Sequence, residues 1–193
     1  DIFVRDLIEK TTTRVSISSD QEEANGSSHW STISGDGRFV AFYSTATNLD
    51  PVDNDIKNDI FLHDRVTGET TLISLALGGQ SGNGRSWWPK ISANGCFVAF
   101  SSVADDLVPD DQGGFQDAFL WENGACESPT ITSADSTIFT IGSMGSFSVT
   151  TEGFPIPVIA YTGSLPDGVT LVDVGDGTAL LSGIPSPGSA GEY

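Results

Sequence analysis

The sequence predicts an all-β protein built from a tandem repeat. The two copies begin at Asp1 and Asp59, an offset of 59 − 1 = 58 positions; aligning them needs no gap, and 23 positions are identical. Both copies contain short stretches rich in β-branched and aromatic residues, separated by glycine-containing turns, and such stretches are typical of strands. No stretch has the pattern of a helix. Self-similarity at a fixed period of this size indicates a propeller or a solenoid.

Each period contains four predicted strands. The first is DIFVRDL, which recurs one period later as DIFLHDR and one further period along in the diverged form DAFLWE. The second is TTRVSIS or TTLISLA, and VTGE before the latter favours a hairpin. The third and fourth are WSTIS or WPKIS and RFVAFYS or CFVAFSS. Between them, Asp36-Gly37 and Asn94-Gly95 predict two-residue hairpins, because both residue types tolerate positive φ.

Four short antiparallel strands repeated radially are the blades of a β-propeller. We therefore expect a partial propeller of about two four-stranded blades. Residues 1–18 finish one blade, residues 30–77 form a complete blade, and residues 88–122 supply three strands of the next. A propeller closes with at least about four blades, so further blades are expected either upstream in a longer polypeptide, which we favour, or from other copies of the chain.

One family shares this pattern. ISGDGRFVAF followed by NDIFLHDRVTGETTLIS resembles the TolB-like β-propeller repeat, a D-G-R-aromatic-V-A-F strand followed by D-I-aromatic-V-x-D. The resemblance covers about residues 1–126 and recurs in register. It implies a propeller platform over this domain. Some TolB-like propellers accompany peptidases or polysaccharide lyases, but the resemblance carries no catalytic residue over to this sequence.

The repeat pattern ends at Cys126, and residues 127–193 are predicted to form a second domain, an immunoglobulin-like β-sandwich. Its expected strands are TIFTIG, GSFSVT, VIAYTG, VTLVDV and ALLSG, with turn residues every 8–12 positions. FPIP, SLPDGVTL and GDGTALLSGIP resemble a bacterial immunoglobulin-like repeat of large surface and secreted proteins, over about residues 128–193. That family's closing strand is absent after GEY, so we expect an incomplete sandwich whose last edge is truncated or filled from another chain.

The composition limits the classes of partner. The chain has 8 basic and 26 acidic side chains, a net charge of −18, which repels phosphate backbones and makes a nucleic-acid partner unexpected. No run approaches the roughly 18 apolar residues of a membrane-spanning helix, so membrane insertion is not expected. The first residue is Asp1, without a methionine or signal-peptide pattern, and we expect a piece of a longer protein or a processed one.

A candidate metal site lies in the loop DPVDNDIKND. Asp53, Asp55 and Asp59 have D-x-D-x-x-x-D spacing, with Asp50 and Asn54 close by. Hard oxygen ligands at this spacing on a loop suit Ca²⁺, which takes six to eight oxygens. The glycine and terminal glutamate of a helix-loop-helix calcium site are absent. The sequence therefore indicates calcium as the candidate cofactor.

The second copy of this loop, VPDDQGGFQD, keeps two of the three carboxylates. Asp111 and Asp117 are retained, while Gly113 stands at the third position, so we expect a weaker metal site there. A competing interpretation needs no metal. Asp59 and Asp117 would then begin a strand by accepting hydrogen bonds from backbone N–H groups.

The two cysteines, Cys96 and Cys126, allow one disulfide. If the CFVAFSS and DAFLWE strands pair antiparallel, the start of one lies beside the end of the other. A bridge would close a loop of 126 − 96 = 30 residues and stabilise the fold by about 3.6 kcal/mol in the chain-entropy relation. It would also imply an oxidising compartment. The alternative is two buried free thiols.

Aromatic and nucleophilic residues give weaker signals. Trp30 and Trp88 occupy the same position in the two copies, and we expect them to pack in the blade core rather than to stack on sugars. His29 and His63 have no serine or aspartate arrangement around them that the sequence defines. No G-x-S-x-G elbow, H-E-x-x-H motif or phosphate-binding loop is present. We therefore do not expect an enzyme.

Taken together, these patterns predict a non-catalytic binding or scaffold segment of a large secreted or surface bacterial protein. The propeller would form a rigid platform, the second domain a spacer or adhesive module, and the partners would be proteins or glycans. One alternative is the non-catalytic part of a propeller hydrolase or lyase. Another is a self-assembling structural protein completed by strands from neighbouring chains. The expected location is extracellular or at the cell surface.

Overall fold

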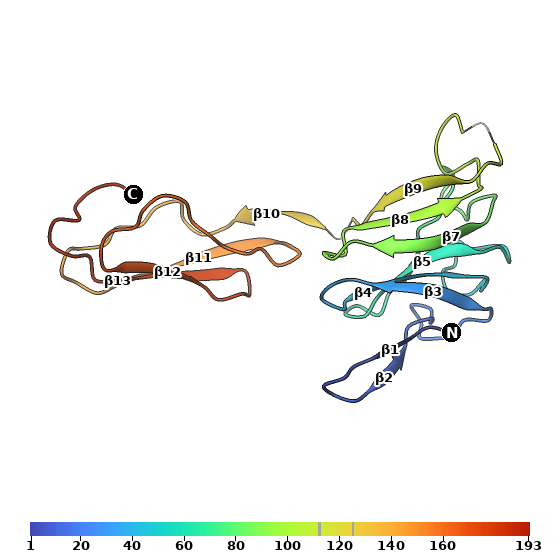
Figure 1. Cartoon of the computed structure of the whole chain (residues 1–193), viewed down its shortest axis with the longest axis horizontal. Helices are drawn as coiled ribbons and strands as arrows, with labels where there is room; N and C mark the ends of the chain where they lie inside the picture. The colour runs from blue at the N-terminus through green and yellow to red at the C-terminus, as the bar shows by residue number, and fades with distance from the viewer. Residues whose placement is uncertain (112, 125) are drawn as a thin grey trace. The chain divides into compact units, whose positions relative to one another are not determined.

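The computed structural model describes residues 1–193 except residues 112 and 125. Over this range the protein has thirteen strands, arranged in four antiparallel sheets, and no helix (Figure 1). No helix able to cross a membrane is found in the described part. The all-β prediction is confirmed. The chain divides into two compact units, Asp1–Gly124 and Ala125–Tyr193, whereas the sequence pattern placed the boundary after residue 126.

The first unit contains three successive sheets, and the second and third each combine strands from two consecutive copies of the repeat. They contain two, four and three strands, respectively. The strands are β1 (Phe3–Arg5), β2 (Thr12–Arg14), β3 (Ser28–Ile33), β4 (Phe39–Ser44), β5 (Asp59–Asp64), β6 (Thr70–Leu72), β7 (Ser86–Ile91), β8 (Phe97–Ser102) and β9 (Asp117–Glu122).

The strand pairing follows the repeat closely. The sheets have the orders β1-β2, β3-β4-β5-β6 and β7-β8-β9, so each strand pairs with its neighbours in sequence. Phe42 pairs with Phe61 in the second sheet, and Phe100 pairs with Phe119 at the equivalent positions of the third. Ser28 and Ser44 share a hydroxyl–hydroxyl hydrogen bond of 3.0 Å, which Ser86 and Ser102 reproduce at the same length. The second and third sheets therefore repeat the same pairing at these positions.

The turns before β4 and β8 differ from the prediction of two-residue hairpins. Ser34 N–H donates to the Phe39 carbonyl, so four residues, 35–38, lie between this bonded pair. Only the glycine of each predicted pair has positive φ, 75° at both Gly37 and Gly95. A two-residue type I′ turn needs positive φ at both central residues. In each copy, the one glycine with positive φ is compatible with the longer turn that is observed.

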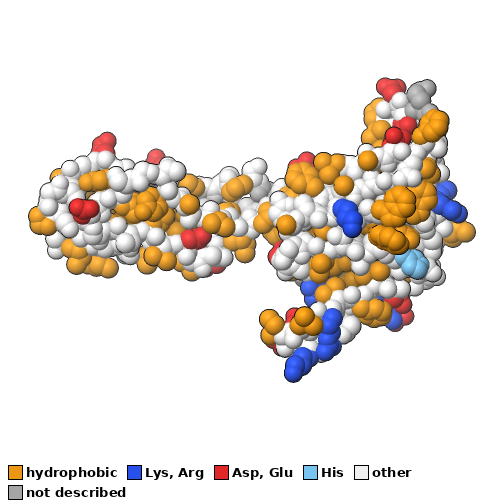
Figure 2. All heavy atoms as spheres, in the orientation of Figure 1, with side chains coloured by type: hydrophobic (Ala, Val, Ile, Leu, Met, Phe, Trp, Pro, Cys, Tyr) orange, Lys and Arg blue, Asp and Glu red, His pale blue; other side chains and the backbone are white. Residues whose placement is uncertain are grey.

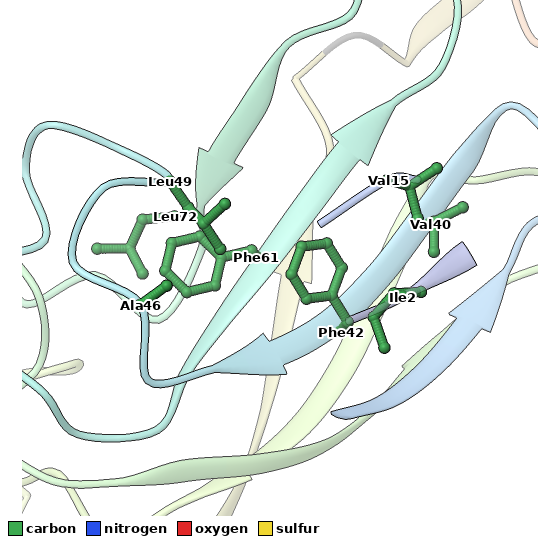
Figure 3. Close-up of a cluster of buried hydrophobic side chains, with 8 residues drawn as sticks. All are labelled: Ile2, Val15, Val40, Phe42, Ala46, Leu49, Phe61 and Leu72. Carbon is green, nitrogen blue, oxygen red and sulfur yellow. The ribbon is translucent and has the colours of Figure 1, made fainter. Parts of the chain in front are cut away.

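The best-defined core lies between the first and second sheets (Figure 3). Phe42 and Phe61 stack with ring centroids 6.0 Å apart. Ile2, just before β1, and Val15, just after β2, belong to the same cluster. The loop after β4 also contributes, because Ala46 and Leu49 are buried there (the full cluster is Ile2, Val15, Val40, Phe42, Ala46, Leu49, Phe61 and Leu72).

The other face of the second sheet is covered by the third. Strand β7 lies against β3, β4 and β5 (Figure 1). Gly35 N–H donates to the Ala93 carbonyl at 2.8 Å, which joins residues at the same position in successive periods. The ring of Phe39 lies over Gly95, where a Cβ would come within 2.6 Å of it. The third sheet therefore packs on the second through residues that occupy equivalent positions in successive copies of the repeat.

The described residues of the second unit contain one four-stranded antiparallel sheet. The sheet order is β10-β11-β13-β12. Among its described residues, Val169 and Ala179 are buried, while Val172 and Val158 are exposed. The strands are β10 (Glu127–Ile131), β11 (Gly145–Phe154), β12 (Val169–Asp173) and β13 (Thr178–Gly183).

Two strands predicted in this unit are wrong. Residues 137–142 and 158–163 are not strands. Pro155 and Pro157 precede the second stretch, and proline cannot donate to a strand ladder. Ile159 N–H instead donates to a carboxylate oxygen of Asp173. In the first stretch, the ring of Phe139 packs over Gly145.

Candidate functional site

The predicted trio of Asp53, Asp55 and Asp59 comes together where the loop after β4 enters β5. Each residue places one carboxylate oxygen within 4.8 Å of the others. Asp59 is fully buried and Asp53 is 5 % exposed, while Asp55 is half-buried. This is the one group of three or more histidine, cysteine or acidic side chains with metal-site spacing found in the described part of the chain.

The two buried carboxylates are only partly hydrogen-bonded. Asp59 Oδ1 accepts a hydrogen bond from Ser74 Oγ at 2.7 Å, and Asp53 Oδ1 accepts one from the backbone N–H of Asp55 at 3.2 Å. The Oδ2 atoms of Asp53 and Asp59 are buried and have no hydrogen-bond partner among the described residues. Buried carboxylate oxygens are rarely left in this state, because desolvation without a partner is costly.

The electrostatics of the trio reflect this burial. Burial raises the pKa of Asp59 to about 7, and the neighbouring carboxylates of Asp53 and Asp55 add to the effect. Burial likewise raises the pKa of Asp53 to about 6. Lys57 supplies the nearby positive charge, through an ion pair between its Nζ and Asp55 Oδ2. The single ammonium group of Lys57 therefore lies near three carboxylates, those of Asp53, Asp55 and Asp59.

The Asp59–Ser74 contact also has a structural role that the repeat reveals. Ser74 Oγ accepts a hydrogen bond from the Ile60 N–H while donating to Asp59, so the carboxylate reaches the backbone through a serine. Asp1 and Ser16 make the same contact one period earlier, with a donor–acceptor distance of 2.9 Å. The expectation that Asp59 binds backbone N–H groups directly is therefore replaced by this relay.

The second predicted loop does not assemble a comparable group. Asp117 is exposed, and Asp111 and Asp117 line a shallow, open depression with Val108 and Phe119. Within the described residues no third carboxylate joins them at metal-site spacing. Gly113 stands where the first loop has Asp55. The first loop is thus the candidate metal site.

The expectation that Trp30 and Trp88 pack in the blade core is wrong. They are 59 % and 47 % exposed. Each lies at a register shift, where the pairing of β3 with β4 or of β7 with β8 is interrupted, and each has positive φ, 56° and 54°. Such bulges turn side chains out of the normal alternation. In Figure 2 hydrophobic side chains gather over β7, beside a histidine over β3.

The remaining predicted residues have structural surroundings. His63 is buried and its Nδ1 lies 2.8 Å from Thr70 Oγ1, and burial lowers its pKa. His29 is exposed and its ring lies 5.7 Å from that of Tyr43. Cys96 and Cys126 are both disulfide-bonded, and neither is a free thiol. Sequence reasoning had left free thiols open as the alternative.

A surface that sequence reasoning missed is the outer face of the third sheet, defined here as Phe97, Ala99, Ala118 and Leu120. These side chains alternate with inward-facing ones along β8 and β9. Phe97 is 40 % exposed, while Phe39 at the same position of the second sheet is 2 % exposed. Leu120 is 69 % exposed against 5 % for Leu62. Comparing the burial of repeated positions locates this face, which a single copy does not reveal.

Comparisons of the chain with protein-family models, curated proteins and solved structures find no match in any of the three.

Proposed function

We propose that this chain is a non-catalytic binding scaffold whose repeats stack as propeller-type blades. The observation that carries the proposal is the outer face of the third sheet. At the preceding step, Phe39 and Leu62 are buried under the next sheet, and the Phe39 ring packs over the Gly95 turn. Phe97 and Leu120 occupy the same positions but remain exposed.

The occupant that fits this face is another sheet of the same repeat. The apolar positions are the same in type, with Phe97 for Phe39 and Leu120 for Leu62. A repeat unit of this kind buries its faces only against its neighbours. In a longer polypeptide, further blades would supply that sheet. For the 193-residue chain in solution, a second copy would supply it, which favours self-assembly as the second candidate function.

A stack of this kind gives a rigid platform whose loops remain free to bind partners. Protein or glycan ligands are the proposed partners, and the exposed Trp30 and Trp88 offer aromatic faces for them. The proposed location is outside the cell or at the bacterial surface. The disulfide-bonded state of Cys96 and Cys126 supports an oxidising compartment. The second unit would act as the spacer or adhesive module.

The experiment is light scattering after size exclusion, over a range of protein concentrations, on the wild type and on Leu120→Lys. We expect the wild type to exceed the 20.3 kDa monomer mass as concentration rises. Losing one buried leucine contact is worth about 1.5–3 kcal/mol, so Leu120→Lys should weaken association about 10- to 150-fold. Because Leu120 is exposed in the single chain, the variant should still fold.

Val66→Lys is the matched control, since Val66 is 73 % exposed in the β5–β6 turn, away from the outer face, and the change in charge is the same. It should associate like the wild type. A wild type that stays at the monomer mass at every concentration would contradict the proposal. So would equal association of Leu120→Lys and Val66→Lys.

A further inference from the structure

We propose that Asp53, Asp55 and Asp59 bind one Ca²⁺ ion at the entrance of β5. The three carboxylates converge within 4.8 Å, from a loop and from the first residue of a strand. All three residues lie in the first unit, and the site does not depend on how the sheets assemble.

The strongest sign of a ligand is the pair of buried oxygens without partners. Asp53 Oδ2 and Asp59 Oδ2 are shielded from solvent and accept no hydrogen bond in the described part of the chain. Their companion oxygens are used, by Asp55 N–H and by Ser74 Oγ–H. An acidic cluster that served only solubility would be solvated. Here two oxygens of buried side chains are left for a cation.

The donor set selects the kind of cation. All three side chains offer carboxylate oxygens, and no histidine or cysteine joins the group. Oxygen ligands of this hardness suit Ca²⁺ and Mg²⁺ rather than zinc or copper. Mg²⁺ usually keeps several waters and uses one or two carboxylates, whereas Ca²⁺ accepts three carboxylates and irregular geometry. Three converging aspartates, two of them buried, therefore favour Ca²⁺.

Lys57 is the competitor for this site. Its ammonium pairs with Asp55 Oδ2, and the Asp55 Oδ1 accepts the Lys57 backbone N–H at 2.6 Å. A bound divalent cation would favour the ionised form of all three carboxylates, and its two positive charges would replace the single charge of the ammonium. Because Lys57 Nζ occupies the oxygen of the least buried aspartate, Ca²⁺ would displace it into solvent. Removal of the ammonium should then tighten binding.

Occupancy would stabilise more than the loop. The segment from β4 to Asp53 is already tied to the fold, since Ala46 and Leu49 belong to the core in Figure 3. Asp50 Oδ2 accepts the Leu72 N–H of β6 at 2.9 Å, and Asp50 also accepts the Asp53 N–H through its carbonyl. A cation joining Asp53 to Asp59 would fix both ends of this loop against β5.

The test is calorimetric titration with CaCl₂, together with thermal unfolding, on protein first freed of metal with EDTA. We expect one Ca²⁺ per chain. At a Ca²⁺ concentration one hundred times Kd, the Tm of the first unit should rise by about 5–10 °C. Asp53→Asn and Asp55→Asn should weaken Ca²⁺ binding at least about tenfold, and Lys57→Gln should strengthen it.

Asp111→Asn is the matched control for Asp53→Asn, because it makes the same change at the repeated position, and Asp117→Asn is a second control at the repeated position of Asp59. Both should bind Ca²⁺ like the wild type. The gain expected in Lys57→Gln separates a lost ligand from a misfolded variant. No heat and no rise in Tm with the wild type would overturn the proposal, as would an equal loss in the controls. Mg²⁺ binding as tight as Ca²⁺ binding would overturn the choice of ion.

Discussion

Replacing Phe61 with alanine should lower the free energy of unfolding of the first unit by about 3–5 kcal/mol. Phe61 is fully buried, stacks on Phe42 and pairs in register with Leu72, so truncation leaves a cavity between the first and second sheets. Urea unfolding followed by tryptophan fluorescence measures this effect, because all four tryptophans lie in residues 1–124.

Phe119→Ala is the matched comparison. Phe119 occupies the same position in the third sheet and stacks on Phe100 at 5.7 Å, but it is only half-buried. Its truncation should cost less than about 2 kcal/mol, because less apolar surface returns to water. Equal costs at Phe61 and Phe119 would contradict the view that the two sheets differ in how far their faces are covered.

Cys96→Ser should lower the free energy of unfolding by about 3.6 kcal/mol, the chain-entropy value for a closed loop of 126 − 96 = 30 residues. The bridge is predicted between Cys96, the residue before β8, and Cys126, which follows β9, and the unfolded chain gains freedom when it is absent. Cys126→Ser should have a similar effect. The measurement is the same urea unfolding curve.

Reduction provides the control for this prediction. Dithiothreitol should shift the wild-type unfolding midpoint to that of Cys96→Ser and leave the variant where it is. If reduction does not change the wild type, or if it destabilises the variant equally, the bridge does not contribute as predicted.

The strands of the first unit were predictable because each is encoded by a short local stretch of sequence and the repeat contains two copies of these stretches. Each strand has its own alternating or apolar stretch, and the repeat shows which stretches correspond. The Phe42–Phe61 pairing follows from consecutive antiparallel strands. The repeat does not show which face of a sheet is covered by another sheet. Phe39 and Phe97 lie in identical FVAF stretches, yet only the first has a sheet above it.

The tryptophans show a second limit. Trp30 and Trp88 were expected in the core because they repeat, but a residue can also repeat because it lies at a strand irregularity that occurs in both copies. The register shifts between His29 and Thr32 and between Trp87 and Lys90 place them outside the alternation. A bulge inserts a residue without changing composition, so periodicity alone does not locate it.

The second unit was predicted less well because its strands have weaker local signals. VIAYTG alternates like a strand, but the prolines before it interrupt backbone pairing. Glu127–Ile131 does form a strand although it contains Pro129, since it lies at the sheet edge beside β11.

For the candidate site, the sequence identified the three aspartates but not their state. Spacing brought Asp53, Asp55 and Asp59 into one loop and strand start. The Ser74 hydroxyl, which binds Asp59 from 15 residues away, has no signal in the loop itself. The burial of Asp53 Oδ2 and Asp59 Oδ2 has no signal in the loop sequence either, because it depends on the packing of neighbouring elements.

The most direct test of the stacked-sheet proposal is hydroxyl-radical footprinting of the whole chain at low and high protein concentration. In dilute protein we predict fast oxidation of Phe97 and Leu120 and slow oxidation of their buried counterparts, Phe39 and Leu62. At high concentration Phe97 and Leu120 should become protected, while the exposed Leu7 stays reactive. Two results would contradict the proposal that this face receives another sheet. One is oxidation of Phe97 and Leu120 as slow as that of Phe39 and Leu62 in dilute protein. The other is no change in the oxidation of Phe97 and Leu120 at high concentration.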